Sequence, residues 1–234
     1  MVCRMIGDSH VGKKHRENQD RIVLRELGPS ESPSSACLIA VVDGASCSAF
    51  AASLARWIAD LHLAVDPVFD AAQADTAQSL AAYLNGLHGQ FVEEFEDIDE
   101  MLQSAASISL AVIHAATADV LWTGDSPVFW TTGGVGNRKT TRLSTPHNEG
   151  RGLTKCFCGM HPCEFDQVRI PLSDGDIVTV MSDGAIHEET LLSGLFERFG
   201  FRQEACREIL DEGLSHPHAD DVSIAACQWG CDSI

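Results

Sequence analysis

The sequence is poor in basic residues, and it contains no apolar run long enough to cross a membrane. Its 234 residues include 16 Lys and Arg against 34 Asp and Glu, which gives a formal net charge of −18 at pH 7. Nucleic acids and anionic membranes are bound through cationic surfaces, so we expect neither as a main partner. A transmembrane helix needs about 20 consecutive apolar residues, which this sequence does not offer. The acidic surface fits a protein that collects divalent cations, and equally a protein that is merely soluble.

Targeting signals, internal repeats and low-complexity tracts are also lacking. The N-terminal stretch 1–14 has no apolar segment of signal-peptide length. The nine cysteines are an odd number scattered along a chain without a secretion signal, which predicts reduced thiols. We therefore expect a cytoplasmic protein in which residues 1–234 form a single domain.

Two periodicities of apolar residues divide the chain into strands and helices. Strands are predicted over 21–27, 36–42, 108–114, 120–123, 127–132, 139–143, 168–171, 177–181 and 222–227. Helices are predicted over 48–63, 70–95, 190–199 and 203–214. The run 36–42 has no polar interruption and is expected to be buried on both faces. A turn-rich loop is expected at 28–35 and a Cys-containing flap at about 144–166.

The order of these elements favours an antiparallel α+β fold. Strands follow one another without a helix between each pair, which argues against a doubly wound parallel sheet. Two stacked sheets with helices outside would use both helix pairs.

Aspartates at the predicted strand ends carry the chemical signal. They lie beside glycine, serine or a second aspartate, and they are Asp20, Asp43, Asp125, Asp183 and Asp220. One Asp-Gly pair is ordinary turn chemistry. Several carboxylates that meet in one crevice repel each other unless a cation neutralises them. Oxygen ligands of this kind suit Mg²⁺ or Mn²⁺ better than Zn²⁺.

These segments resemble the motifs of the metal-dependent protein phosphatases of type 2C, in the order that the family has them. They are Ser9–Asp20 (SHVGKKHRENQD), Val41–Ser46 (VVDGAS), Trp122–Ser126 (WTGDS), Val180–Glu188 (VMSDGAIHE) and Asp220–Ile224 (DDVSI). Each motif alone is weak, but the ordered set covers nearly the whole chain. The resemblance implies a four-layer α-β-β-α sandwich, two stacked antiparallel sheets flanked by helix pairs. Since the family contains monomers, a monomer is expected.

The resemblance also implies an activity, the hydrolysis of phosphoserine and phosphothreonine in phosphorylated proteins with two Mn²⁺ or Mg²⁺ ions. Asp43 would be the carboxylate shared by both metals, and the Gly44 carbonyl would bind one of them. Asp183 and Asp220 would hold the other metal, with Asp20 near the second-metal end. Asp125 matches a residue that, with Asp183, holds a weaker third ion in bacterial members. A hydroxide between two cations attacks phosphorus directly, so no cysteine is expected to act as a nucleophile.

The sequence departs from the family pattern at several positions. His15 stands where the family offers an arginine for the substrate phosphate, so His15 and its neighbour Arg16 are both candidates for this task. Gln19 replaces a common glutamate, and Ala45 stands where animal members carry a histidine thought to be the general acid. These departures raise a second interpretation, a weak or inactive family member that binds phosphoproteins or a signalling partner. Asp221 fills a family asparagine position and is expected to orient its loop.

The flap allows a further interpretation. Cys156, Cys158 and Cys163, with His147 or His161, would supply the ligands of a structural zinc site. Their spacing matches no strong zinc pattern, and thiols also serve as small apolar side chains. The flap is expected to shape substrate choice.

Overall fold

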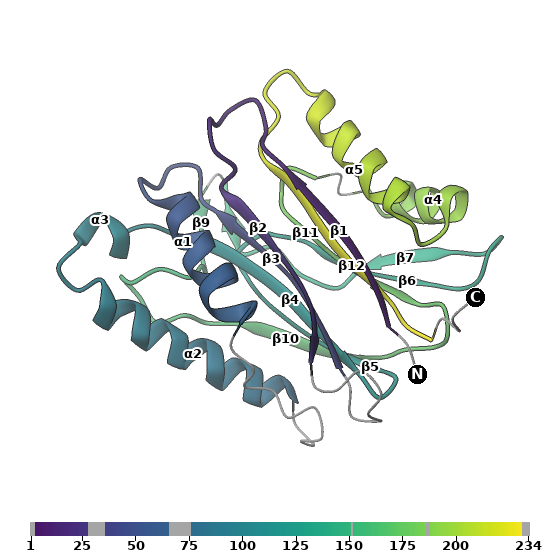
Figure 1. The fold of residues 1–234 in the computed structure, drawn as a ribbon, viewed down its shortest axis with the longest axis horizontal. Helices are drawn as coiled ribbons and strands as arrows, with labels where there is room; N and C mark the ends of the chain where they lie inside the picture. Colours follow the sequence, from purple (N-terminus) through teal and green to yellow (C-terminus); the bar gives the residue numbers. More distant parts are fainter. Residues whose placement is uncertain (1–2, 28–35, 66–75, 151, 186–187, 231–234) are drawn as a thin grey trace.

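In a computed structural model, two antiparallel sheets lie face to face in the middle of the molecule (Figure 1). The structure describes residues 3–27, 36–65, 76–150, 152–185 and 188–230. The predicted loop at 28–35 and the predicted helix start at 70–75 lie outside them.

One sheet has the order β1-β12-β11-β6-β7 and the other β10-β5-β4-β3-β2. The strands of the first are β1 Arg4–His10, β12 Val222–Gln228, β11 Ile177–Met181, β6 Val128–Thr132 and β7 Lys139–Arg142. Those of the second are β10 Asp166–Pro171, β5 Thr117–Thr123, β4 Ala106–His114, β3 Ala36–Gly44 and β2 Asp20–Leu27.

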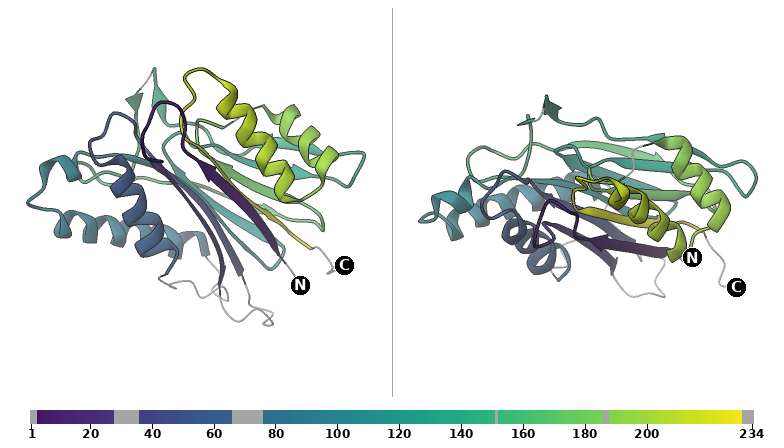
Figure 2. Two further views of the ribbon diagram at one scale, coloured as in Figure 1. Left: turned by 45° about the horizontal axis from the view of Figure 1, so that its top comes forward. Right: turned by 90° about the horizontal axis from the view of Figure 1, so that it is seen from above.

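Helices cover the outer face of each sheet, as Figures 1 and 2 show. The helices are α1 Ala51–Ile58, α2 Thr76–Glu94, α3 Asp99–Leu102, α4 Glu189–Phe199 and α5 Gln203–Ser215. The first two pack on the second sheet through one apolar cluster, which includes Leu54, Leu84 and Phe91. The last two pack on the first sheet through another, which includes Leu192 and Ile209. The predicted four-layer arrangement is confirmed.

Strand β3 shows why the layers stack. Its even-numbered apolar residues, such as Leu38 and Ala40, belong to the core under α1 and α2. Its odd-numbered ones, such as Ile39 and Val41, belong to the core between the two sheets. Successive side chains of a strand point to opposite faces, so this run serves two cores at once. The prediction of burial on both faces is confirmed.

Several elements differ from the sequence-based expectation. Strand β1 was not predicted, because its segment RMIGDSH is half polar and forms a strand by pairing with β12 from Arg4↔Gln228 to His10↔Val222. The first predicted helix continues from α1 as a π-helix over Ala59–Leu63. The second ends at Glu94, and α3 follows it. The flap contains a small strand pair, β8 Asn148–Glu149 and β9 Gly152–Leu153.

Within the described part of the chain, no helix is both long and apolar enough to cross a membrane. The strand ends that carry the predicted aspartates all lie at one end of the sandwich. Strands β2 and β12 begin there, whereas β3, β5 and β11 end there.

Candidate functional site

Asp20 and Asp43 lie side by side at the end of the second sheet. The antiparallel register pairs Asp20 with Asp43, and Asp43 with Ser107 on β4. Directly paired residues point to the same face of a sheet. Asp43 shares the face of Val41, which lies between the two sheets. The three side chains therefore form a row that faces the neighbouring sheet.

Asp125 extends this row by one strand. Its Oδ1 accepts a hydrogen bond of 2.9 Å from Ser107 Oγ, and its Oδ2 accepts one of 3.3 Å from Asn148 Nδ2 in the flap. The turn before it is held by His147, which is buried and whose Nδ1 lies 3.2 Å from the Gly124 N–H. Because that N–H is a donor, Nδ1 is the acceptor, and Nε2–H donates to Asp166 Oδ2 at 3.0 Å. The flap is thereby fastened to the Asp125 turn.

The first sheet contributes the loops after β11 and before β12. The backbone N–H of Asp183 lies 3.4 Å from Asp43 Oδ2, so these two residues from different sheets meet. The next residue, Gly184, passes so close to the β12 loop that a Cβ atom would lie 2.0 Å from the Asp221 carbonyl oxygen and 3.3 Å from Asp220 Cβ. The Asp183-Gly184 turn thus lies between Asp43 and Asp220.

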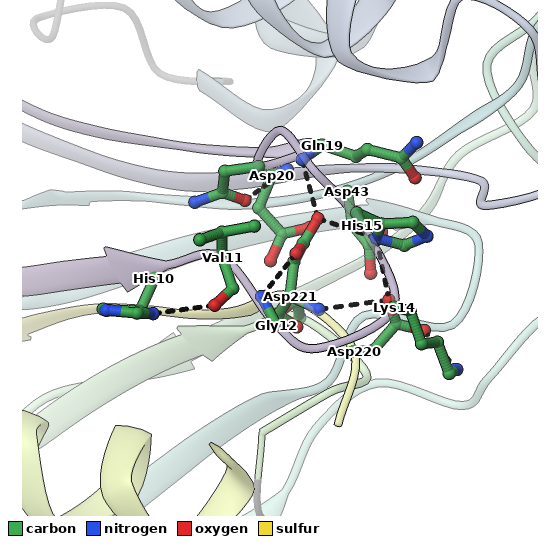
Figure 3. Close-up of polar contacts among 12 residues, drawn as sticks. His10, Val11, Gly12, Lys14, His15, Gln19, Asp20, Asp43, Asp220 and Asp221 are labelled. Atoms are coloured by element: carbon green, nitrogen blue, oxygen red, sulfur yellow. Dashed lines mark hydrogen bonds and ion pairs between the residues drawn. The ribbon is translucent and has the colours of Figure 1, made fainter. Parts of the chain in front are cut away.

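Asp221 holds the loop that precedes β2, as Figure 3 shows. Its two carboxylate oxygens accept hydrogen bonds of 2.7 Å from the N–H groups of Gly12 and Gln19. His15 Nδ1 lies 3.1 Å from Asp221 Oδ2 and 3.3 Å from Asp220 Oδ1. Because Asp221 is almost fully buried and these two oxygens already accept backbone hydrogen bonds, its contacts agree with the predicted role of orienting the loop.

Acidic side chains surround Asp20 and Asp43 and shift their pKa values. Burial is the largest cause that raises the pKa of Asp20 to about 7, and the charge of Asp221 adds to it. Burial also raises the pKa of Asp43 well above its ordinary value, followed by the charges of Asp20, Asp183 and Asp125. Neutral carboxyl groups are favoured at such a place only while no cation is bound.

The donor set fits a hard divalent cation. Asp20 is 2% exposed, yet its Oδ2 has no hydrogen-bond partner. A buried carboxylate oxygen without a partner is costly, and a metal ion would satisfy it. The groups around it are carboxylates from both sheets, and oxygen donors of this kind suit Mg²⁺ or Mn²⁺.

The basic residues of the 12–19 loop border a pocket of about 340 Å³. Its other wall is the start of α1, from Ala49 to Ser53. Lys14 Nζ lies 2.7 Å from Asp220 Oδ2, and His15 is turned toward the two aspartates. Arg16 is exposed and forms no ion pair with the described residues. Of the three, Arg16 has its charged group most available to a ligand.

The cysteines of the flap do not gather into a metal site. Cys163 is buried in the apolar core under α1 and α2. Among the described residues, two groups of three metal-ligating atoms lie within 4.8 Å of one another, and neither includes Cys156, Cys158 or Cys163. The structure therefore gives no support to the zinc interpretation of this segment.

Gly124 leads to a prediction about the Asp125 turn. Its φ is +96°, and a Cβ atom would lie 2.1 Å from Ser107 Oγ. Gly124→Ala is expected to lower the free energy of unfolding by about 3 kcal/mol, because strain and a clash add together. Urea unfolding measures this, with Gly134→Ala as the control, since a Cβ there meets nothing within 4 Å. Equal stability of the two variants would contradict the role of this turn.

The comparisons with known proteins agree with this geometry. A family described as protein phosphatase 2C matches residues 6–223. The chain belongs to the protein phosphatase 2C family. No curated protein matches it at a significant level of sequence similarity. As a member of this family, the chain is a metal-dependent serine/threonine phosphatase that acts on phosphoproteins.

Solved structures of similar fold include several bacterial phosphatases. The S. agalactiae serine/threonine phosphatase has 14% sequence identity and a TM-score of 0.82, over 97% of this chain and 99% of the other. PppA of Pseudomonas aeruginosa, a regulatory component of T6SS, has 19% identity and a TM-score of 0.75, over 97% and 98%. The catalytic domain of PstP in complex with two manganese ions has 16% identity and a TM-score of 0.74, over 97% and 98%. These likenesses confirm the type 2C phosphatase fold.

Several residues at the site were not predicted from the sequence. Ser107 and Asn148 bind Asp125, and His147 fastens the flap to its turn. No spacing marks them, because each acts on a residue more than 15 positions away in the chain. The sequence signal nearest to them was the Gly-Asp-Ser motif, which predicts the turn but not what holds it.

Proposed function

We propose that this chain is an active phosphatase whose reaction uses two Mn²⁺ or Mg²⁺ ions, with room for a third. The ligands would be the carboxylates and the carbonyl at the catalytic end of the sandwich, namely Asp20, Asp43, Gly44, Asp125, Asp183 and Asp220. The observation that carries this proposal is the convergence of acidic residues on Asp43: Asp20 is paired with it across β2 and β3, and the Asp183 N–H lies 3.4 Å from its Oδ2. Burial, followed by the charges of Asp20, Asp183 and Asp125, raises the pKa of Asp43. The buried Asp20 Oδ2 has no hydrogen-bond partner, which costs stability unless a cation binds there.

When bound, a pair of divalent ions supplies a water molecule acidic enough to attack phosphorus near neutral pH, and positive charge beside the phosphoryl oxygens. The protein's own residues position the reactants. Asp43 lies between the other carboxylates and would hold both ions in fixed places. Asp221 keeps the 12–19 loop against the β12 loop, which places the basic residues beside the pocket. Ala45 offers no proton, so water would protonate the leaving serine oxygen.

We further propose Arg16, rather than His15, as the main residue that binds the substrate phosphate. His15 is 14% exposed and held by two carboxylates, whereas Arg16 is exposed at the pocket. A guanidinium group also binds two phosphate oxygens at once.

Arg16→Ala is therefore expected to raise KM for a phosphopeptide about tenfold or more. His15→Ala is expected to change KM less, because its contacts are with the loop aspartates. Steady-state kinetics at saturating Mn²⁺ distinguish the two. A larger KM effect in His15→Ala would reverse the assignment.

The proposed function is tested with protein stripped of metal by a chelator. Turnover of p-nitrophenyl phosphate and of phosphoserine and phosphothreonine peptides should be absent, and should return with Mn²⁺ or Mg²⁺. Equilibrium dialysis with elemental analysis should give at least two ions per chain, and fewer in Asp183→Asn. Asp211→Asn, an exposed acid on α5, is the matched control.

The alternative of a weak or inactive member that only binds phosphoproteins or a signalling partner gains no specific support from this site. It would be favoured if the Mn²⁺-loaded protein retained a phosphopeptide without hydrolysing it. Phosphorylated proteins are the expected partners in either case. A monomer remains the expected state, and size-exclusion chromatography with light scattering tests it.

A further inference from the structure

Three cysteines meet at the end of the sandwich opposite the phosphatase site. Cys3 precedes β1, Cys37 lies near the start of β3, and Cys227 lies near the end of β12. Their Sγ atoms all lie within 4.8 Å of one another. Cys37 is six residues before Asp43 on the same strand, which places the thiols about 20 Å from the catalytic carboxylates.

The surroundings of these thiols are apolar. Cys37 and Cys227 are buried in the core between the two sheets, and Cys3 packs against that core from a partly exposed position. Met5 packs there too and is paired directly with Cys227 across β1 and β12. Hydrogen bonds from Cys227 and Cys37 lower the pKa of Cys3 to about 4, so its thiolate form is favoured beside the other two sulfurs.

We propose that Cys3, Cys37 and Cys227 form a binding site for one thiophilic metal ion, Cu(I). Sulfur ligands select soft ions, and Cu(I) accepts three of them. A structural zinc site has four ligands, and among the described residues no fourth His, Cys, Asp or Glu joins this group. The three sulfurs would bind the ion as thiolates, so uptake of Cu(I) would release the protons of those thiols to the solvent.

A Cu(I) ion bound to these three cysteines would cross-link the two sheets. Its ligands come from both sheets, since β3 belongs to one and β12 to the other. An ion that binds only the folded chain stabilises it by mass action. Binding and thermal stability are therefore readouts that do not depend on phosphatase activity.

The test uses reduced full-length protein under nitrogen, with Cu(I) supplied as its complex with a coloured chelator. Wild-type protein should remove one Cu(I) more per chain from the chelator than Cys3→Ser removes, and its melting temperature should rise. Cys3→Ser changes a partly exposed residue outside the strands, and its circular dichroism shows whether it folds. Cys206→Ser, a buried cysteine outside the group, and Cys156→Ser/Cys158→Ser should behave as wild type. The proposal is wrong if Cys3→Ser and wild type take up equal amounts, or if Cu(I) leaves the melting temperature unchanged.

A separate observation concerns the surface beside α1. A groove of about 320 Å³ is lined mostly by apolar side chains of the α1 region, the π-helix and the segment that follows α2, together with Ser53 and Arg56. Three of these side chains are unusually exposed for their type, Phe50 at 40%, Leu61 at 56% and Ile98 at 43%. The groove shares Phe50 and Ser53 with the pocket that the 12–19 loop borders, so the two adjoin at these residues. Exposed apolar surface of this kind marks binding sites.

The rim of the groove is acidic. The exposed acids next to it are Glu93, Glu94, Glu96, Asp97, Asp99 and Glu100. Trp57 in the groove donates a hydrogen bond of 3.1 Å to Glu94, which ties the rim to the floor. The basic residue Arg56 lies near Asp60, 4.0 Å away. The rim would attract a cationic chain, and the floor would hold an apolar side chain.

We infer that this groove docks a segment of the phosphorylated substrate protein in which Lys or Arg residues flank an apolar anchor. This inference rests on the proposed phosphatase activity, because the segment would be joined to the phosphoserine that enters the adjoining pocket. Two linked contacts raise the effective concentration of the phosphate at the site. Loss of the groove contact would therefore raise KM more than it lowers kcat.

Two phosphopeptides with the same phosphoserine core test the docking. One continues into a basic segment with a leucine anchor, and the other has Glu in place of Lys and Arg. The first should have a kcat/KM about tenfold higher, and Ile98→Ser or Glu96→Lys/Asp97→Lys should remove this advantage. Val135→Ser, which is 83% exposed on another surface, is the control. Equal kcat/KM for the two peptides would refute docking, while lack of p-nitrophenyl phosphate turnover would refute the phosphatase activity itself.

Discussion

Asp43→Asn is expected to lower kcat for Mn²⁺-stimulated hydrolysis by at least about 1,000-fold, which corresponds to ~4 kcal/mol of transition-state stabilisation. Asp43 is the carboxylate on which the charges of Asp20, Asp183 and Asp125 converge. Its amide replacement keeps the shape of the side chain but removes the negative charge that would hold both ions. The measurement is single-turnover and steady-state hydrolysis of a phosphopeptide at several Mn²⁺ concentrations.

The same variant should be more stable than wild type when no metal is present. At pH 8 the carboxylates around Asp43 repel one another, and asparagine removes one member of this group. Asp211→Asn serves as the control for both measurements, since it removes an exposed charge that is not among the groups that shift the pKa of Asp20 or Asp43. Retention of more than a tenth of the wild-type activity, or a loss of stability in the metal-free variant, would contradict the assignment.

The metal-free protein is expected to lose stability as the pH rises from 4 to 7. The pKa of Asp20 is raised from 3.8 to about 7 in the folded state, so the folded chain keeps a proton that the unfolded chain releases. The stabilisation from this group is fully present below pH 4 and is lost as the pH passes through 7. A pKa change of this size corresponds to on the order of 4 kcal/mol.

Saturating Mn²⁺ should remove this dependence, because the ion takes the place of the proton. Thermal or urea unfolding between pH 4.5 and 8, with and without Mn²⁺, measures the effect. Asp20→Asn should flatten the metal-free profile, whereas Asp211→Asn should leave it unchanged. A metal-free wild-type protein whose stability is constant or rises over this range would show that Asp20 does not hold a proton in the folded chain.

The departures from the family pattern have a structural context in the 12–19 loop. His15 stands where the family has an arginine; it lines the pocket, but its Nδ1 contacts Asp220 and Asp221. The next residue, Arg16, is exposed at that pocket. If Arg16 binds the phosphate as proposed, the positive charge is moved by one position, while Asp221 still holds the loop.

The amino-acid sequence by itself determined the layers and the identity of the acidic residues. Strand β3 could be predicted because an unbroken apolar run must be buried on both faces, and α1 because its apolar residues recur at helical spacing. The aspartates could be named because each follows or precedes a strand within a motif. These signals are local, so a single stretch of sequence carries each of them.

Only the tertiary structure decided which residues meet. Strand β1 is half polar and becomes a strand through its pairing with β12, more than 200 residues away. The contacts of Asp221 with Gly12 and Gln19, and those of Asn148 and His147 with the Asp125 turn, join separate segments and have no periodic signature. The three thiols come together for the same reason, because the stacking of two sheets, rather than any spacing along the chain, brings their strands into contact.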